Sequence, residues 1–459
     1  MLYSSLLFIY IFLPVSILLY YVTPTKHREK TLLILSAVFC GMINLWFLGF
    51  MLVYIAVNYI AMRTIDKFSE RKEIASIPFA AAVCFDLTAV LIFRTKYFVS
   101  FLSDIGVPNG FFPLGISFFT LSVIGTLIDV YTGKMKSDKN VLRFALYIIF
   151  FPRLIMGPVM RYGSFNKAVK ERRDGLYEMG VGFTIFVKGL AKKIIAADNL
   201  YMLYTAVGRV DYNELSALTA WIGITAYILC LYFTLSGFSD MGVGISYCFG
   251  VRLPKSFSYP MSSNKIRYFA ARWHTNVTHW FRRYVTRPLS RSIKNRYARQ
   301  AVSIAVWGLF GFWYTFSMNG FIWGLLIGTA MTLESRLDKR RIMMISGVIY
   351  TFLTVAVCSV FLAEESFSGA FRYLLAMLGG NRIFADTIAL YLLKSYIVIL
   401  LIGLYISTSL FRNMLIRSGK NKLSKAFNII SPIAVTGILI VCTVMISYSG
   451  SSGMILMKL

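Results

Sequence analysis

Long apolar stretches recur from one end of this 459-residue chain to the other. A helix of about 20 apolar residues crosses the hydrocarbon core of a bilayer, whereas a soluble fold cannot bury so many such segments. The candidate spans are residues 3–22, 31–62 (read as two segments), 74–93, 110–130, 141–160, 178–197, 214–233, 300–314, 319–335, 341–363, 385–407 and 427–447. The pattern predicts an all-α polytopic membrane protein with about eleven transmembrane helices. We expect a single integral membrane domain over residues 1–459.

Composition and charge support a membrane environment. The chain is 57% hydrophobic and only 15% charged, whereas soluble proteins carry about 25% charged residues. Its 48 Lys and Arg against 20 Asp and Glu give a net charge of +28. The basic residues gather in short loops between apolar stretches, as the positive-inside rule predicts for cytoplasmic loops. The excess of positive charge therefore does not indicate nucleic-acid binding. Candidate cytoplasmic loops are 24–30, 63–72, 166–173 and 412–425.

Residues 252–299 do not fit a plain helical bundle, because they hold twelve basic residues and no Asp or Glu, with Trp, Phe and Tyr interleaved. Residues 264–289 within them are typical of an amphipathic helix that lies at, or dips into, the membrane interface. One interpretation is anchoring at the membrane surface by Arg and Trp. The other is a basic floor that receives an anionic or phosphate-bearing substrate.

Two apolar stretches, 108–120 and 234–250, are rich in Gly and Pro or in Gly and Ser. Such residues interrupt helices, and non-helical backbone at membrane depth survives only where protein or a water-filled cavity satisfies it. We therefore expect re-entrant or half-helix segments around a central cavity. This expectation favours an enzyme or a transporter over a passive anchor.

Few side chains are suited to acid–base chemistry. The histidines are His27, His274 and His279, and the last two would lie about 140° apart on a helix, which argues against a shared metal site. The six cysteines form no Cys/His cluster, so no metal is expected. An acidic side chain within an apolar segment costs free energy to place in the membrane. The two readings of such a residue are an ion pair with Arg or Lys and the orientation of a reacting group. These acids are Asp86, Asp129, Asp198 and Asp240.

Several blocks resemble, in order along the chain, the membrane-bound O-acyltransferase (MBOAT) family. The resemblance is to its bacterial polysaccharide branch, which includes alginate O-acetyltransferases and teichoic acid D-alanyl transferases. The blocks are residues 113–120 (PLGISFFT), 128–131 (IDVY), 150–162 (FFPRLIMGPVMRY), 188–199 (KGLAKKIIAADN), 236–241 (SGFSDM), 252–260 (RLPKSFSYP), and 272–274 (RWH) with Trp280, Arg282 and Pro288. The resemblance implies the family's fold and a multi-pass place in a bacterial cytoplasmic membrane.

The chain departs from the family where a second histidine, regarded as catalytic, follows in a W-H-G block. Residues 312–315 here read FWYT, so Tyr314 stands in its place. A tyrosine, with an ordinary pKa of about 10, is a poor base near pH 7. Three accounts stay open: His274 or His279 takes over as base, Tyr314 acts as a donor in a rewired site, or the chain is a non-catalytic relative.

The resemblance also implies a reaction, in which an acyl group, acetyl above all, moves from a cytoplasmic thioester toward a cell-surface polysaccharide. The donor would be acyl-CoA or an acyl-carrier protein, with no tightly bound cofactor, and an extracellular or membrane-anchored acyltransferase would be a partner. The implied site residues are His274 as catalytic base, Asp240 and Asn276 to orient it, Tyr314 in the second position, and Arg272 and Lys265 to attract the donor's phosphates. A transporter or flippase, and a structural subunit of a polymer-modification or export complex, are the alternatives.

Overall fold

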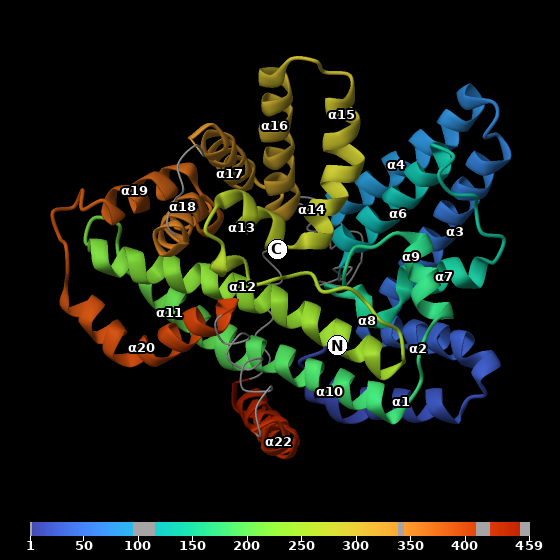
Figure 1. The fold of residues 1–459 in the computed structure, drawn as a ribbon, viewed down its shortest axis with the longest axis horizontal. Coiled ribbons are helices and arrows are strands. Elements are labelled where there is room, and N and C mark those ends of the chain that lie inside the picture. Colours follow the sequence, from blue (N-terminus) through green and yellow to red (C-terminus); the bar gives the residue numbers. More distant parts are fainter. Residues whose placement is uncertain (1, 95–114, 338–343, 410–422, 450–459) are drawn as a thin grey trace. The chain divides into compact units, whose positions relative to one another are not determined.

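The computed structural model describes residues 2–94, 115–337, 344–409 and 423–449. All regular structure in these ranges is helical, which confirms the all-α prediction (Figure 1). Within the described residues, five helical segments are long and apolar enough to cross a membrane: Leu45–Lys67, Lys72–Arg94, Ala217–Cys248, Ser346–Ala363 and Thr387–Ser407. Shorter apolar segments are Phe8–Val22, Ile116–Tyr131 and Pro432–Tyr448. The total of about eleven spans stays a prediction. Most of the basic loop 412–425 and the first part of segment 108–120 lie outside the described residues.

The chain divides into two compact units, and the expectation of one domain stays a prediction. Unit 1 comprises Met1–Phe186 and Phe238–Lys255. Its helices are η1 (Phe8–Phe12), α1 (Leu13–Val22), η2 (Thr25–His27), α2 (Arg28–Ile43), α3 (Leu45–Lys67), α4 (Lys72–Arg94), α6 (Ile116–Tyr131), α7 (Val141–Ile149), α8 (Phe151–Leu154) and α9 (Tyr162–Lys170). The beginning of α10 (Leu176–Ala191) and the end of α12 (Ala217–Cys248) also belong to it.

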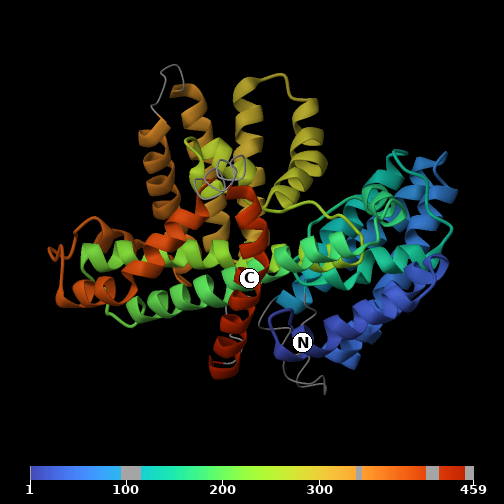
Figure 2. The same ribbon diagram turned by 60° about the horizontal axis from the view of Figure 1, so that its bottom comes forward.

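Unit 2 comprises Val187–Gly237 and Ser256–Leu459. Besides the remaining parts of α10 and α12, its helices are η3 (Lys192–Ala197), α11 (Asp198–Val207), η4 (Pro260–Ser262), α13 (Ile266–Arg272), α14 (Thr275–Phe281), η5 (Arg282–Thr286), α15 (Arg287–Arg291), α16 (Arg296–Thr315), α17 (Met318–Leu337), α18 (Met344–Ala363), α19 (Phe367–Met377), α20 (Thr387–Ser407) and α22 (Leu423–Ser449). Helices α16 and α17 coincide with the predicted spans 300–314 and 319–335 and pack side by side (Figures 1 and 2).

Short polar side chains fix where several helices begin. Asn44 starts α3 by accepting a hydrogen bond from the backbone N–H of Trp46 at 2.8 Å, and Asn295 starts α16 in the same way. Asp386 accepts from the N–H of Ala389 at 2.7 Å at the start of α20. Each side chain satisfies one of the backbone donors that a helix leaves unpaired at its first turn.

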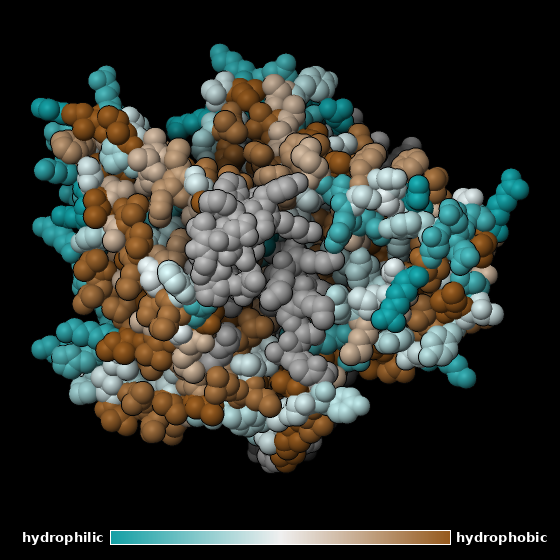
Figure 3. All heavy atoms as spheres, turned by 180° about the vertical axis from the view of Figure 1, so that it is seen from behind, coloured by the Kyte–Doolittle hydropathy of each residue, from teal (hydrophilic) through white to brown (hydrophobic). Residues whose placement is uncertain are grey.

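Apolar side chains cover much of the outer surface of the helices. Leu18, Val22, Ile34, Ile60 and Val398 are all exposed, and Figure 3 shows broad apolar patches on the face that it draws. Patches of this extent on a water-soluble monomer would drive association. They are what helices in contact with lipid require.

The predicted break at 234–250 is wrong, because residues 217–248 form one helix, α12. Its glycines serve close packing instead of interruption. A methyl group at Gly244 would lie 2.6 Å from the carbonyl oxygen of Gly182, and one at Gly237 would lie 2.8 Å from that of Gly189, both on α10. Small residues let membrane helices approach closely, and the two helices run side by side (Figure 1).

Two other predicted segments are interrupted. The predicted span 141–160 is helical for only nine residues, as α7, and the separate short helix α8 begins at Phe151 with Pro152 in its first turn. Nine residues rise only about 14 Å, too little to cross a bilayer. The amphipathic stretch 264–289 is not one helix either, because the chain breaks at Trp273 and His274 between α13 and α14.

Candidate functional site

The break between α13 and α14 positions His274. Its backbone adopts the left-handed conformation, with φ of 46°, and it serves as the N-cap residue of α14. Its carbonyl accepts hydrogen bonds from the N–H groups of Val277 and Thr278 at 3.0 and 3.1 Å. A left-handed non-glycine residue costs about 1–3 kcal/mol and persists only where its surroundings hold it.

A neighbouring segment, Ser256 to Ser258, holds this break in place. The N–H of Thr275 donates to the carbonyl of Ser256 at 2.7 Å, and the amide of Asn276 donates to the Ser256 hydroxyl at 3.0 Å. The N–H of Ser258 donates to the carbonyl of Arg272 at 3.2 Å. The backbone on both sides of His274 is therefore tied to one segment, which accounts for the strained conformation.

The imidazole of His274 lies in an aromatic enclosure and is 1% exposed. Phe257 stacks on it with ring centroids 5.1 Å apart, and Tyr314 meets it edge-on at 6.2 Å. Burial lowers the pKa of His274 to about 3. The histidine is therefore neutral near pH 7, the state in which a ring nitrogen can accept a proton.

Tyr314 comes from the end of α16 and is buried. Its ring packs on Phe310 and Trp323 at 5.7 and 6.1 Å between centroids, and Trp273 lies next to its hydroxyl. The family resemblance placed His274 and Tyr314 in one site, and the structure brings them together. Their catalytic roles stay predictions.

Close packing of α16 on α17 sets the position of Tyr314. A methyl group at Gly311 would lie 2.0 Å from the carbonyl oxygen of Gly320, and one at Gly324 would lie 2.0 Å from that of Trp307. The pairs 311–320 and 307–324 show that the two helices run antiparallel. The left-handed residue Phe316 ends α16 just after the site.

The other predicted site residues are distributed more widely. His279 is exposed on α14, away from the enclosure around His274. Asp240 is half-buried on the part of α12 that belongs to unit 1, whereas His274 belongs to unit 2. Lys265 precedes α13 and is half-buried, and Arg272 ends α13 with its guanidinium 3.4 Å from the Ser263 hydroxyl.

The acids of the apolar segments have structural partners. Asp129 accepts from the guanidinium of Arg161 at 2.9 Å, and Asp198 pairs with Lys193. Asp86 departs from the expected pairing with a cation, because it accepts a hydrogen bond from the amide of Asn58 at 2.8 Å.

Sequence reasoning missed Glu334, which supports the site from α17. Its buried carboxylate accepts hydrogen bonds from the N–H groups of Ile266 and Arg267 at 3.0 and 3.2 Å, at the start of α13. A carboxylate is favourable at a helix N-terminus. The one available signal was an acid near the end of an apolar span, and nothing in the sequence indicates its partner.

Comparison with known proteins gives consistent matches. Residues 133–344 match the family model described as MBOAT, membrane-bound O-acyltransferase family. The probable alginate O-acetylase AlgI of Azotobacter vinelandii is 31% identical over 391 residues, which cover 82% of this chain and 78% of that protein. The peptidoglycan O-acetyltransferase of Helicobacter pylori is 26% identical over 83% of this chain and 80% of its own length. The teichoic acid D-alanyltransferase of Bacillus subtilis is 30% identical over 49% of this chain and 60% of its own length.

Proposed function

We propose, from the premise that the chain belongs to the membrane-bound O-acyltransferase family, that it transfers an acyl group to a cell-surface polysaccharide. The protein is a multi-pass protein of a bacterial membrane. The acyl group would be acetyl, delivered as a thioester of coenzyme A or of a carrier protein in the cytoplasm. An extracellular or membrane-anchored acyltransferase would be its partner. The names of the relatives support transfer of an acetyl group to a cell-surface polymer, whereas the donor and the partner rest on the family resemblance.

One observation carries the proposal: a buried, neutral histidine sits at a strained break and faces the position of the family's second histidine. His274 would take the proton of the acceptor hydroxyl as its oxygen attacks the thioester carbonyl carbon. The tetrahedral oxyanion then collapses, the carbon–sulfur bond breaks, and the thiolate leaves and recovers the proton. The Tyr314 hydroxyl would donate to the oxyanion.

The remaining predicted residues have supporting roles in the proposal. Asn276 acts through Ser256, to which it is hydrogen-bonded, and so holds the backbone beside His274. Lys265 and Arg272 flank α13 and would attract the phosphates of the donor. Asp240 is retained as a candidate to orient His274, on the basis of the family resemblance.

The test measures base-labile ester on purified surface polysaccharide. Cells would lack the gene, express the intact protein, or express His274→Ala or His279→Ala at matched membrane levels. His279 is the matched control because it is exposed and five residues away. We expect ester to require the gene, to fall about 10²–10⁴-fold with His274→Ala, and to persist with His279→Ala. Ester that persists with His274→Ala would rule out His274 as the base.

The second candidate function is a non-catalytic scaffold, and the tyrosine at position 314 favours it. Such a subunit would bind acyl donor, polymer or a partner enzyme without carrying out transfer. Gene-dependent ester that ignores His274→Ala would identify it. The variant Tyr314→His restores the family residue, so a gain of transfer with it would identify a site that retains its geometry but has lost one catalytic group.

A further inference from the structure

Unit 1 contains an open surface cavity of about 420 Å³, lined mainly by exposed side chains, which lies outside the candidate active site. This volume falls in the range of small-molecule sites, about 300–1,000 Å³. The cavity is lined by Ser164, Lys167, Ala168, Glu171, Arg173 and Arg252. Three of these side chains are cations and one is a carboxylate, so the lining is predominantly positive.

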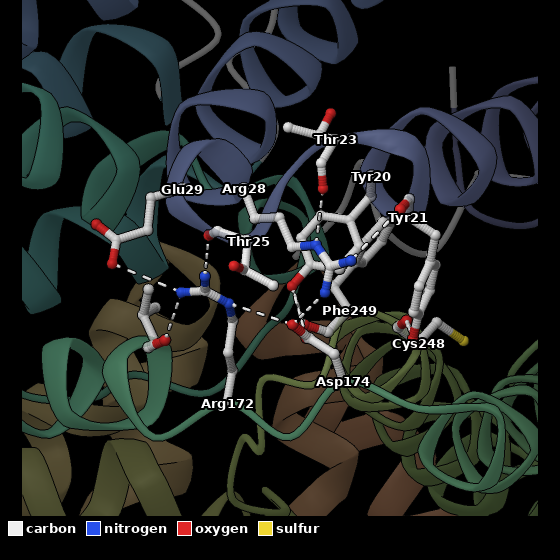
Figure 4. A network of polar contacts seen from close by, with 11 residues as sticks. Tyr20, Tyr21, Thr23, Thr25, Arg28, Glu29, Arg172, Asp174, Cys248 and Phe249 are labelled. Atoms are coloured by element: carbon white, nitrogen blue, oxygen red, sulfur yellow. Dashed lines mark hydrogen bonds and ion pairs between the residues drawn. The ribbon is translucent and has the colours of Figure 1, made fainter.

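The backbone of Arg173 is fixed by its two neighbours, while its side chain is exposed. Asp174 pairs with Arg28 at 2.5 Å and accepts a hydrogen bond from the hydroxyl of Tyr20 at 2.8 Å. Arg172 donates to the carbonyl of Thr25 at 2.8 Å (Figure 4). Residues 172 and 174 are therefore committed to one polar network, while Arg173 between them lines the cavity.

The position of Arg252 is fixed by a close approach of two chain segments. The N–H of Arg173 donates to the carbonyl of Gly250 at 3.0 Å. Gly250 has φ of +72°, and a methyl group there would lie 2.6 Å from the carboxylate of Asp174. Only glycine permits this contact, which brings residue 252 to the cavity beside residue 173.

Not all of these cations are neutralised. The Nζ atom of Lys167 lies 3.9 Å from a carboxylate oxygen of Glu171, but both side chains are mostly exposed. Exposed ion pairs of this kind contribute little free energy. Arg252 pairs with Glu178. Within the described residues, the side chain of Arg173 forms no ion pair. The exposed guanidinium fork of Arg173 matches the oxygens of a phosphate, and the exposed Ser164 adds a hydroxyl donor.

We propose that this cavity binds a phosphate ester, held by Arg173 and Lys167 with Arg252 and Ser164 beside them. The loop 166–173 is among the predicted cytoplasmic loops, so the ligand would come from the cytoplasmic side. Two sources carry this chemistry: a soluble cytoplasmic nucleotide, distinct from the donor whose phosphates are assigned to Lys265 and Arg272, and the headgroup of an anionic phospholipid. The site does not depend on acyl transfer at His274.

The experiment uses the full chain purified into nanodiscs. In the first arm the discs contain phosphatidylcholine only, and adenosine 3′,5′-bisphosphate is titrated by calorimetry. In the second arm the discs contain phosphatidylglycerol, and native mass spectrometry counts the lipid molecules that stay bound. Arg173→Ala and Lys167→Ala test the cavity. Lys170→Ala is the matched control, because Lys170 is exposed on the same helix as Lys167 and does not line the cavity.

We expect saturable binding of one probe, weakened about ten-fold by Arg173→Ala, the effect of losing one charge-assisted hydrogen bond. Lys167→Ala should weaken it less, and Lys170→Ala should leave it unchanged. Binding in the first arm identifies the nucleotide phosphate, and binding in the second arm alone identifies the lipid headgroup. The proposal is overturned if neither probe binds, or if Lys170→Ala weakens binding as much as Arg173→Ala. If His274→Ala binds the probe as tightly as the parent protein, the phosphate site is independent of acyl transfer. Each of the two proposals can then fail without the other.

Discussion

The packing of α16 on α17 gives a prediction that links stability to the site. Gly311 lies one turn before Tyr314, and a methyl group there would lie 2.0 Å from the carbonyl oxygen of Gly320 and 2.9 Å from the N–H nitrogen of Gly324. Real Cβ contacts are essentially never shorter than 3.0 Å. In Gly311→Ala the two helices must therefore part by roughly 1 Å, because both atoms are backbone and cannot turn aside.

The magnitude follows from two opposing effects. Overpacking costs about 1–3 kcal/mol, and a clash with backbone belongs at the upper end of that range. Alanine in a helix recovers about 1 kcal/mol relative to glycine. We expect Gly311→Ala to destabilise the protein by about 2 kcal/mol. Gly49→Ala on α3, where a methyl group meets nothing within 4 Å, should stabilise it by about 1 kcal/mol.

Thermal unfolding of both variants in the same lipid nanodiscs measures this difference. Gly311→Ala should have a lower Tm than the parent, and Gly49→Ala an equal or higher Tm. Gly311→Ala should also reduce ester formation, because Tyr314 moves with its helix. If Gly311→Ala were as stable as Gly49→Ala, the helices would not be held at the close contact described, and the argument for the position of Tyr314 would fail.

Three further predictions follow from individual contacts. The pKa of His274 is about 3 in the folded protein, below the ordinary value of about 6.5. The stability that depends on a neutral His274 is therefore fully present above pH 6.5 and is lost as the pH falls toward 3. Between pH 7.5 and 5, the Tm of His274→Gln should fall less than that of the parent protein. Arg161→Gln removes the ion pair between Arg161 and the buried Asp129 and should cost about 2 kcal/mol. Asp129→Asn in the same chain should largely recover this loss, as thermal unfolding would report. Glu334→Ala removes the hydrogen-bond acceptor at the start of α13, so it should cost about 1–2 kcal/mol of stability and raise hydrogen exchange at the amide of Ile266. The control Ser335→Ala, at the neighbouring exposed residue of α17, should change neither quantity.

Helix α12 shows which features the sequence predicts and which it does not. Its hydropathy predicted a span correctly, but its Gly and Ser content predicted an interruption that is absent. Glycine costs a helix about 0.5–1 kcal/mol relative to alanine, and close packing of a neighbouring helix can offset that cost. Here Gly182 and Gly189 on α10 provide the surface that Gly244 and Gly237 need. That partner is more than 45 residues away in sequence, and periodicity within one segment carries no information about it.

The break at His274 shows the reverse case. Amphipathic periodicity predicted a continuous helix over 264–289, and neither Gly nor Pro stands at residues 273 and 274 to signal an interruption. The break exists because Ser256 and Ser258 compete for the backbone groups around it. Family resemblance indicated His274 and Tyr314, whereas local propensity gave no reason to choose His274 over His279. The geometry that distinguishes these two histidines is tertiary.

The low pKa of His274 constrains how transfer could proceed. A base is most effective when its pKa lies near the working pH, and burial holds this imidazole far below it. The proton can therefore stay on His274 only while negative charge develops nearby, and the oxyanion of the acyl intermediate is such a charge. Tyr314, protonated near pH 7, can stabilise that oxyanion as a donor but cannot replace a base. Tyr314→Phe keeps the ring and removes only the hydroxyl, so this account requires ester formation to fall about 10²–10³-fold in that variant. If ester formation is unchanged in Tyr314→Phe, the ring of Tyr314 serves packing alone and this account of oxyanion stabilisation is refuted.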